Sequence, residues 1–382
     1  MSSICKHFPD CGGCRTIDVP YADQLLAKQV DFIACASQHF PEAVPFIAPI
    51  IGCETPLYYR NKMEYAFGSD ETRVYLGLKR RGHFDQVVPL TECFLLSDKM
   101  GDIFAICNAY FSEKQTSTWN PRRHSGLLRH LSIRHSKGDD QYLLNFIVSE
   151  ACAELILPLA QSLAAKFPEI VSILMSVNES HGDHALFSSS DILHGQDFIE
   201  ESLGEVRFKI SPLSFFQSNP RQAEVLYDQI RKLAVESASD RILDLYCGIG
   251  SIGLYLARHV GSVIGIEENP SAINDAHANA ERNGISNVSF KLGKVKNILK
   301  FETFDADCIV TDPPRCGMTP KALKRMIAVG APRIVYVSCN PVTLFQELAV
   351  ICENGYRVDI VQPVDMFPNT LHVETVVKLV KI

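Results

Sequence analysis

The stretch ILDLYCGIGSIG, residues 242–253, decides the fold of the C-terminal half of this chain. An apolar run ends near Asp244, and Gly248, Gly250 and Gly253 follow it in the spacing G-x-G-x-x-G. Glycines in this spacing, between a strand and a helix, allow a tight turn and let a ligand approach the backbone. The stretch therefore predicts a nucleotide-binding turn at the edge of an open α/β sheet.

Apolar strand-like runs alternate with helical patterns on both sides of this turn. A helix start is indicated by Asn219 and Pro220, and it precedes the runs SVIGIE, VSFKLG, DCIVTD and RIVYVS, at 262–267, 288–293, 307–312 and 333–338. Such alternation predicts a parallel sheet covered by helices on both faces. We expect an α/β fold in which residues 211–382 form a doubly wound, Rossmann-like domain.

Acidic residues at the predicted strand ends bear on the choice of ligand. Glu267 ends the second strand and could accept hydrogen bonds from ribose hydroxyls, which suits either NAD or S-adenosylmethionine (SAM). Asp244 would be unfavourable beside a pyrophosphate but suits a methionine ammonium group, so we favour SAM. Asp312 begins Asp-Pro-Pro, a stiff loop that is common in SAM enzymes that modify bases.

Two further residues indicate covalent chemistry. Cys339 follows the fifth strand directly before a helix, whose N-terminal dipole is expected to lower the thiol pKa. Glu374 begins the last strand, which in the usual SAM fold runs antiparallel beside the fifth, making the sheet mixed. A thiolate could add to C6 of uracil, and a carboxylate could remove the C5 proton after methylation. The alternatives are a buried apolar cysteine and a solvated glutamate.

The segment upstream of residue 211 follows a different pattern. Short runs such as RVYLGLK and QYLLNFIV, at 73–79 and 141–148, predict β-strands, and helical patterns flank them. We expect residues 51–210 to form an α+β substrate-binding domain. The chain carries a net charge of −7, but residues 121–138 contain five cations and no acid: Arg122, Arg123, Arg129, Arg134 and Lys137. This stretch is either a phosphate-binding surface or a solvated strand face.

The N-terminal segment, residues 1–50, contains a cysteine cluster and a predicted helix. Cys5, Cys11 and Cys14 lie within ten residues, and the chain has 13 cysteines in all. No secretory signal and no apolar run of membrane-spanning length is visible, so we expect a cytoplasmic protein without membrane contact. In a reducing compartment, clustered cysteines indicate a metal site.

Four stretches together resemble the RNA (uracil-5-)-methyltransferase family: DLYCGIGSIG, DPPRCG, VSCNPVTL and LHVETVVKL. The likeness extends over residues 211–382, and YRNKMEYAF and LRHLSIRHS resemble the substrate-facing domain of the family. The resemblance implies that Cys339 is the nucleophile and Glu374 the base. It also implies that Gln217, Tyr246, Glu267 and Asp312 surround SAM, and the glycine turn itself adds Asp244 and Gly248 as cofactor-binding candidates.

The same resemblance implies a [4Fe–4S] cluster held by Cys5, Cys11, Cys14 and, in the stretch PLTECFLLSD, Cys93. Four thiolates by themselves suit either iron–sulfur or zinc. The chain is most similar to the shorter enzymes that methylate bacterial 23S rRNA, because no separate β-barrel (TRAM) module precedes the cysteines. We expect a monomer that acts on 23S rRNA without an obligate protein partner. The alternatives are a tRNA T-loop methyltransferase, another SAM methyltransferase, a non-catalytic iron–sulfur RNA-binding protein and an NAD oxidoreductase.

Overall fold

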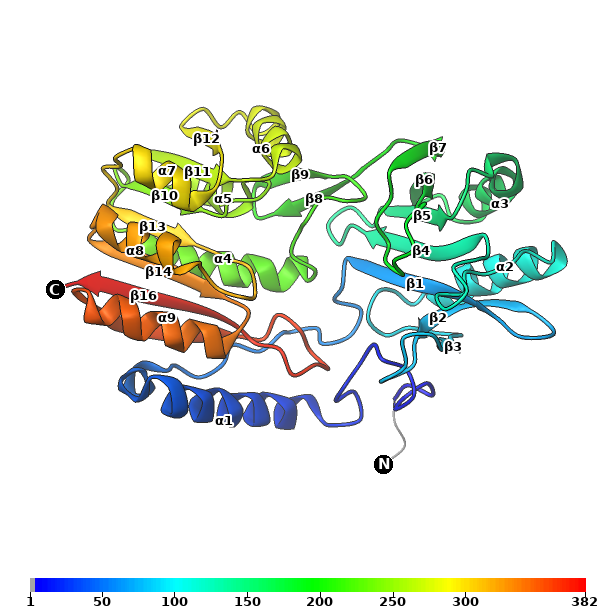
Figure 1. Cartoon of the computed structure of the whole chain (residues 1–382), viewed down its shortest axis with the longest axis horizontal. Helices are drawn as coiled ribbons and strands as arrows, with labels where there is room; N and C mark the ends of the chain where they lie inside the picture. Colours follow the sequence, from blue (N-terminus) through cyan, green and yellow to red (C-terminus); the bar gives the residue numbers. More distant parts are fainter. Residues whose placement is uncertain (1–3) are drawn as a thin grey trace.

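The computed structural model describes residues 4–382, which form two seven-stranded sheets side by side and one small hairpin (Figure 1). The C-terminal sheet has the order β12-β11-β10-β13-β14-β16-β15. Its strands are β10 (Arg241–Leu245), β11 (Ser262–Glu267), β12 (Val288–Leu292), β13 (Cys308–Thr311), β14 (Arg333–Ser338), β15 (Tyr356–Val364) and β16 (Glu374–Lys381). The five strands from β10 to β14 are parallel, and β16 inserts antiparallel between β14 and β15. This order confirms the predicted mixed, doubly wound sheet.

Helices cover both faces of the C-terminal sheet. They are α4 (Pro220–Ala234), α5 (Ser251–Ala257), α6 (Pro270–Arg282), α7 (Val295–Phe301), α8 (Pro320–Val329) and α9 (Pro341–Glu353). Side chains of Asn219, Asn269, Thr319 and Asn340 accept hydrogen bonds from the first turns of α4, α6, α8 and α9, each of which begins with proline. These caps satisfy amides that have no partner within the helix, so each helix starts at a defined residue.

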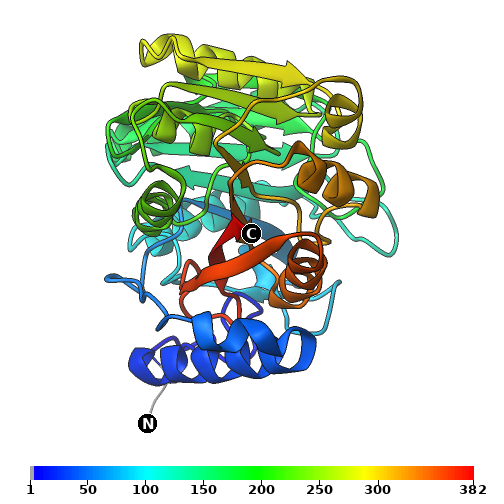
Figure 2. The ribbon, with the colours of Figure 1, turned by 90° about the vertical axis from the view of Figure 1, so that its left-hand side faces the viewer.

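The N-terminal helix α1 (Tyr21–His39) and the 3-10 helix η1 (Pro41–Phe46) pack against the C-terminal domain. Phe32 and Ala36 of α1 belong to the same apolar core as Phe345 and Leu348 of α9, and the Phe32 and Phe345 ring centroids are 5.2 Å apart. Figures 1 and 2 show α1 running beneath α9 and β16. The helix of the N-terminal segment thus becomes part of the C-terminal core.

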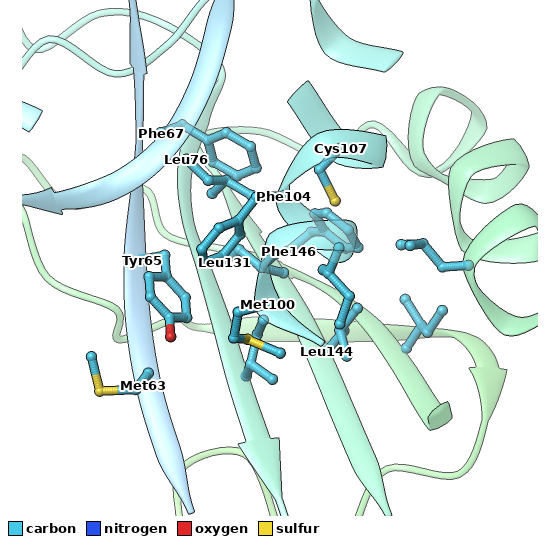
Figure 3. Packing of buried hydrophobic residues seen from close by; sticks show 14 of the residues in the cluster. Met63, Tyr65, Phe67, Leu76, Met100, Phe104, Cys107, Leu131, Leu144 and Phe146 are labelled. Carbon is cyan, nitrogen blue, oxygen red and sulfur yellow. The ribbon is translucent and has the colours of Figure 1, made fainter. Parts of the chain in front are cut away.

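The central sheet has the order β3-β2-β1-β4-β5-β6-β7 and is antiparallel except for the pair β5–β6. Its strands are β1 (Lys62–Ser69), β2 (Val74–Lys79), β3 (Val87–Pro89), β4 (Leu128–His135), β5 (Tyr142–Val148), β6 (Ile170–Val177) and β7 (Ser189–Gly195), and its helices are α2 (Met100–Glu113) and α3 (Ala153–Lys166). Figure 3 shows Phe67 of β1, Phe104 of α2 and Phe146 of β5 in one apolar core. Every residue of β4 and β5 is buried, so both faces of these strands are covered.

The burial of β4 overturns most of the phosphate-binding expectation for residues 121–138. Arg129 is 1% exposed and donates hydrogen bonds to the carbonyl oxygens of Asn178 and Ser180, at 2.7 and 2.6 Å. Arg134 is 2% exposed and donates to the carbonyl oxygen of Pro212 at 3.0 Å. Carbonyl groups from distant parts of the chain therefore supply the acceptors that this stretch lacks.

The remaining cations of this stretch differ in exposure. Lys137 is partly buried and donates to the carbonyl oxygen of Leu96 at 2.7 Å, so the expectation is wrong for it as well. Arg122 and Arg123 are exposed, but Arg122 pairs with Asp85 at 2.6 Å. The stretch is therefore not a continuous phosphate-binding surface.

A hairpin of β8 (Ile199–Leu203) and β9 (Val206–Ile210) joins the two sheets. Its inward side chains, such as Leu203 and Phe208, share a core with Leu226 of α4 and Ile252 of α5. The C-terminal core thus starts upstream of residue 211, the expected start of that domain. Within residues 4–382, no helix combines the length and apolar character that a membrane span requires.

Candidate active site

The glycine turn lies at the carboxyl end of β10. Gly248 and Gly250 have left-handed backbones, with φ of 55° and 79°, and a Cβ on Gly250 would lie 2.9 Å from the Phe290 ring. The Gly248 amide donates to Glu267 Oε2 at 3.2 Å, and the Asn269 amide donates to Glu267 Oε1 at 2.8 Å. The turn and the end of β11 are thereby fixed to each other.

Asp244 is the most unusual charged group of the turn. It is fully buried, and neither carboxyl oxygen has a hydrogen-bond partner of normal geometry. Burial raises the pKa of Asp244 to about 8, with further contributions from Asp312 and Glu267, and the Gly253 amide offsets only part of this. Burial also raises the pKa of Asp312, at the end of β13, to about 6. An unpaired buried carboxyl group is costly and marks a place where a ligand can bind.

The carboxyl groups at these strand ends have a common electrostatic consequence. Asp312 raises the pKa of both Asp244 and Glu374, so these groups lie within range of one another's charge. A cationic ligand would relieve this repulsion, whereas a pyrophosphate would add to it. This group of carboxyl groups therefore favours the ammonium and sulfonium charges of SAM over a dinucleotide.

Cys339 and Glu374 lie within range of each other's charge, although 35 positions separate them in the sequence. In the antiparallel pair of β14 and β16, Ser338 lies opposite Thr375, so Cys339 and Glu374 occupy the next positions in register. Burial raises the pKa of Glu374 well above its usual value, and Asp312 adds to the effect. A thiol and a carboxyl group at neighbouring positions can serve as nucleophile and base toward one substrate.

The thiol pKa does not follow the expectation from the helix start. Burial raises the pKa of Cys339 to about 11, and Glu374 and Asp312 contribute to the increase. The side chain of Asn340 caps α9 by accepting from the Val342 amide at 3.2 Å, so a donor of the first turn is already satisfied. Arg315 opposes the increase in the pKa of Cys339, and it opposes the increase in the pKa of Glu374 in the same way.

Arg315 is the functional candidate that the sequence reasoning missed. It follows the Asp-Pro-Pro loop, and its carbonyl oxygen accepts from Asn340 Nδ2 at 3.0 Å, which ties it to the residue after Cys339. Its guanidinium group lies 3.2 Å from His372 Nδ1. The available signal was a cation directly after a stiff loop at a strand end.

Gln217 lies in the segment that precedes α4, and Tyr246 lies in the glycine turn after β10. Gln217 is 8% exposed, and its carbonyl oxygen accepts from Asn61 Nδ2 at 2.9 Å, so the central domain positions it. Tyr246 directly follows β10 with a left-handed φ of 63°, and burial raises its pKa to about 12. Both positions are compatible with the cofactor contacts that we expect.

The four cysteines expected to bind a cluster lie near one another. Burial raises the pKa of Cys14 to about 12, and the thiols of Cys93, Cys11 and Cys5 contribute in that order. For Cys93, the Tyr65 hydroxyl and two backbone amides oppose the effect of burial. Within the part of the chain that the structure describes, no three Cys, His, Asp or Glu side chains are arranged to hold a metal ion.

A cationic groove of about 590 Å³ lies between the cysteine segment and the central sheet. Arg15, Arg60 and Arg81 line it, and neither Arg15 nor Arg60 forms an ion pair with any residue from 4 to 382. Arg15 and Arg60, like Arg315, lower the pKa of His372, although burial is the largest cause. The groove therefore lies within electrostatic range of His372, two residues before Glu374.

An adjoining hollow of about 480 Å³ shares Arg60 with the groove. Phe215, which is 74% exposed, also lines it. Exposed aromatic and cationic side chains around one hollow are typical of surfaces that bind single-stranded nucleic acid.

Comparisons with known proteins are consistent with this geometry. The family model described as tRNA (Uracil-5-)-methyltransferase matches residues 187–382. An uncharacterized RNA methyltransferase of Clostridium tetani is 37% identical over 99% of this chain and 84% of the relative. One of Chlorobaculum tepidum is 36% identical over 98% of this chain and 82% of the relative. The crystal structure of Pyrococcus abyssi tRNA (uracil-54, C5)-methyltransferase in complex with S-adenosyl-L-homocysteine has a TM-score of 0.80 at 28% identity, covering 97% of this chain and 86% of that chain.

Proposed function

Because the chain belongs to the RNA (uracil-5-)-methyltransferase family, we propose that it methylates C5 of one uridine in 23S rRNA through a covalent adduct with Cys339. The family membership makes it a SAM-dependent RNA methyltransferase. The observation that carries the covalent mechanism is the neighbouring register of Cys339 and Glu374 at the end of β14 and the start of β16.

The reaction follows from the nucleophilic weakness of uracil C5. We propose that the Cys339 thiolate adds to C6, so that an S–C6 bond forms and the ring electrons move toward C5 and O4. SAM, when bound, supplies the electrophilic methyl group that C5 takes up. The Glu374 carboxylate then removes the C5 proton, the electrons restore the C5–C6 double bond, and the S–C6 bond breaks to release the thiolate.

The raised pKa values of Cys339 and Glu374 indicate that both groups hold their protons in the ligand-free site. Arg315 is placed to favour their charged forms, since it lowers both values. The carboxyl groups around Asp244 would gain a cationic partner when SAM binds, which reduces the repulsion that raises these pKa values.

We propose that the RNA approaches along the groove of Arg15, Arg60 and Arg81. Unpaired guanidinium groups suit phosphates, because they form bidentate hydrogen bonds at little desolvation cost in an exposed groove. The target uridine must be single-stranded or extruded, since a thiolate cannot reach C6 inside a stacked helix. Phe215 could stack on a neighbouring base.

We also propose that Cys5, Cys11, Cys14 and Cys93 hold a [4Fe–4S] cluster. The mutual effects of these thiols on the pKa of Cys14 support their proximity. The donors around Cys93 support a thiolate there, because Tyr65 and two amides stabilise negative charge on its sulfur. Iron and acid-labile sulfide analysis of anaerobically purified protein tests this proposal, and zinc in place of iron would overturn it.

The choice of 23S rRNA as substrate rests on the cysteine run, which resembles that of the shorter ribosomal enzymes. An enzyme that acts on this RNA would work in the cytoplasm, where its substrate is. A tRNA uridine is the second candidate, because the matching family model and the Pyrococcus abyssi neighbour are both described as acting on tRNA.

Tritium release from RNA labelled at uracil C5 separates the two candidates. The protein is incubated with SAM and either 23S rRNA or bulk tRNA. Release from 23S rRNA alone supports the whole proposal. Release from tRNA alone keeps the chemistry and overturns the substrate, whereas release from neither RNA overturns the chemistry.

A further inference from the structure

A buried ion pair joins helix α1 to the loop that precedes Glu374. Lys28 Nζ lies 2.6 Å from Asp365 Oδ1, and the two side chains are only 4% and 0% exposed. Removing two charges from water is costly, and their attraction often does no more than offset that cost. Fold stability is therefore a weak explanation for this pair.

Lys28 contacts the loop between β15 and β16 near its start and near its end. Besides Asp365, its ammonium group donates to the carbonyl oxygen of Phe367 at 3.0 Å and to that of His372 at 3.1 Å. All three donors of the group are thus used on the 365–373 loop, which connects β15 to β16. His372 is two residues before Glu374, so Lys28 fixes the backbone immediately upstream of the proposed base.

Two more residues of α1 support the same loop. Tyr21 donates from its hydroxyl to Asp365 Oδ2 at 2.8 Å. Gln24 accepts from the Asn369 amide at 2.9 Å and donates to Asn369 Oδ1 at 3.1 Å, where the loop has a left-handed φ of 64°. The apolar packing of α1 uses other positions, such as Phe32 and Ala36, so these polar groups serve the loop.

We propose that Lys28 is a positioning residue that holds the 365–373 loop so that the Glu374 carboxylate meets the C5 proton of the methylated adduct. The proposal rests on the proposed function, in which Glu374 is the base. Addition of the thiol depends on Cys339, which lies between β14 and α9 and outside this loop. Loosening the loop should therefore slow the last step, in which Glu374 takes the C5 proton and the S–C6 bond breaks.

The decisive variant replaces both charges, Lys28→Met with Asp365→Asn. Removing the pair together leaves no unpaired buried charge, although the Phe367 and His372 carbonyl oxygens lose a donor, so the protein should be less stable than the wild type but still fold. Turnover should fall roughly 100-fold, the typical effect of misplacing a reacting group by about 1 Å. Covalent RNA–protein adduct should accumulate to most of the enzyme on denaturing gels, while the KM for RNA changes little.

The matched control is Arg333→Met with Asp240→Asn. This pair is also buried, with a 2.7 Å contact and side chains 10% and 8% exposed, but it lies at the opposite end of β14. Its loss should leave turnover and adduct levels unchanged. The inference is overturned if the Lys28 double variant accumulates no more adduct than this control, or if both variants lose turnover equally.

Glu374→Gln distinguishes this inference from the proposed function. Adduct in Glu374→Gln but not in the Lys28 double variant overturns the positioning role alone. No adduct in Glu374→Gln overturns Glu374 as the base, and the positioning role with it. Adduct in both variants supports the inference.

Discussion

The central sheet and the C-terminal sheet both bury charged side chains, but they surround them with different partners. In the central sheet, Arg129 and Arg134 each donate hydrogen bonds to carbonyl oxygens and lie within the core. At the carboxyl ends of the C-terminal strands, both oxygens of Asp244 lack such a partner. A charge that the fold satisfies contributes to structure, whereas one left unpaired is available to a ligand.

Replacing the nucleophile should have the largest effect, and it tests whether the carboxyl ends of the C-terminal strands carry the chemistry. Cys339→Ala should lower methyl transfer by roughly 10⁴-fold or more, because no other group can form the adduct. SAM binding, measured calorimetrically, should persist, since the carboxyl groups at the strand ends remain. Cys316→Ala, an exposed thiol on the Asp-Pro-Pro loop, serves as the control and should remain active. Equal losses in both variants would contradict the assignment of Cys339.

Asp244→Asn should have the next largest effect and tests the unpaired carboxyl directly. It should weaken SAM binding about 100-fold, an energy typical of losing one hydrogen-bonded charge. It should also flatten the pH dependence of unfolding in the ligand-free protein. The pKa of Asp244 is about 8 in the fold and near 3.8 when unfolded, so the unfolded state binds fewer protons between these values.

Stability of the wild type should therefore fall as pH rises from about 4 to 8, by roughly 1.4 kcal/mol per pH unit from this group. Urea unfolding at pH 5 and pH 7.5 measures the slope for the wild type and Asp244→Asn. Asp312, with a pKa of about 6, should add a smaller contribution of the same sign in both proteins. An identical slope in the two proteins would show that a protein partner already satisfies Asp244.

The same contrast explains what the sequence could predict. The glycine turn, the mixed strand order and the meeting of Cys339 with Glu374 follow from the periodicity of the strands and the resemblance to a known fold. The burial of Arg129 and Arg134 could not be predicted from strand periodicity or from the resemblance. Their acceptors are carbonyl groups 49 and 78 residues away, and main-chain acceptors leave no mark on the residue pattern.

The hydrogen bonds of Lys28 to the 365–373 loop could not be predicted from the sequence for a related reason. Its partners lie more than 330 positions away, so only the folded chain brings α1 beside β16. The lowered-pKa expectation for Cys339 failed because its local environment outweighs the helix start: burial and two acids surround the thiol. Sequence reasoning therefore located groups on strand ends well and estimated their surroundings poorly.

The smallest expected effect concerns RNA affinity. The experiment compares the groove arginines, which lack an ion pair, with a buried arginine of the central sheet. Arg15→Ala with Arg60→Ala removes two unpaired cations from the groove and should weaken RNA binding roughly 10-fold at moderate salt. The slope of log affinity against log salt should fall by about one to two, because fewer counterions are released. Stability should change little, since neither side chain forms an ion pair within residues 4–382.

Arg129→Met is the counterpart from the central sheet. It leaves the Asn178 and Ser180 carbonyl groups without their donor and removes a cation stacked 3.9 Å from the Trp119 ring centroid. The free energy of unfolding should fall by about 2 kcal/mol while the salt dependence of RNA binding stays that of the wild type. A reduced salt slope in Arg129→Met, with an unchanged slope in the groove variant, would reverse the assignment, because it would mean that the buried arginines bind phosphate and the exposed ones do not.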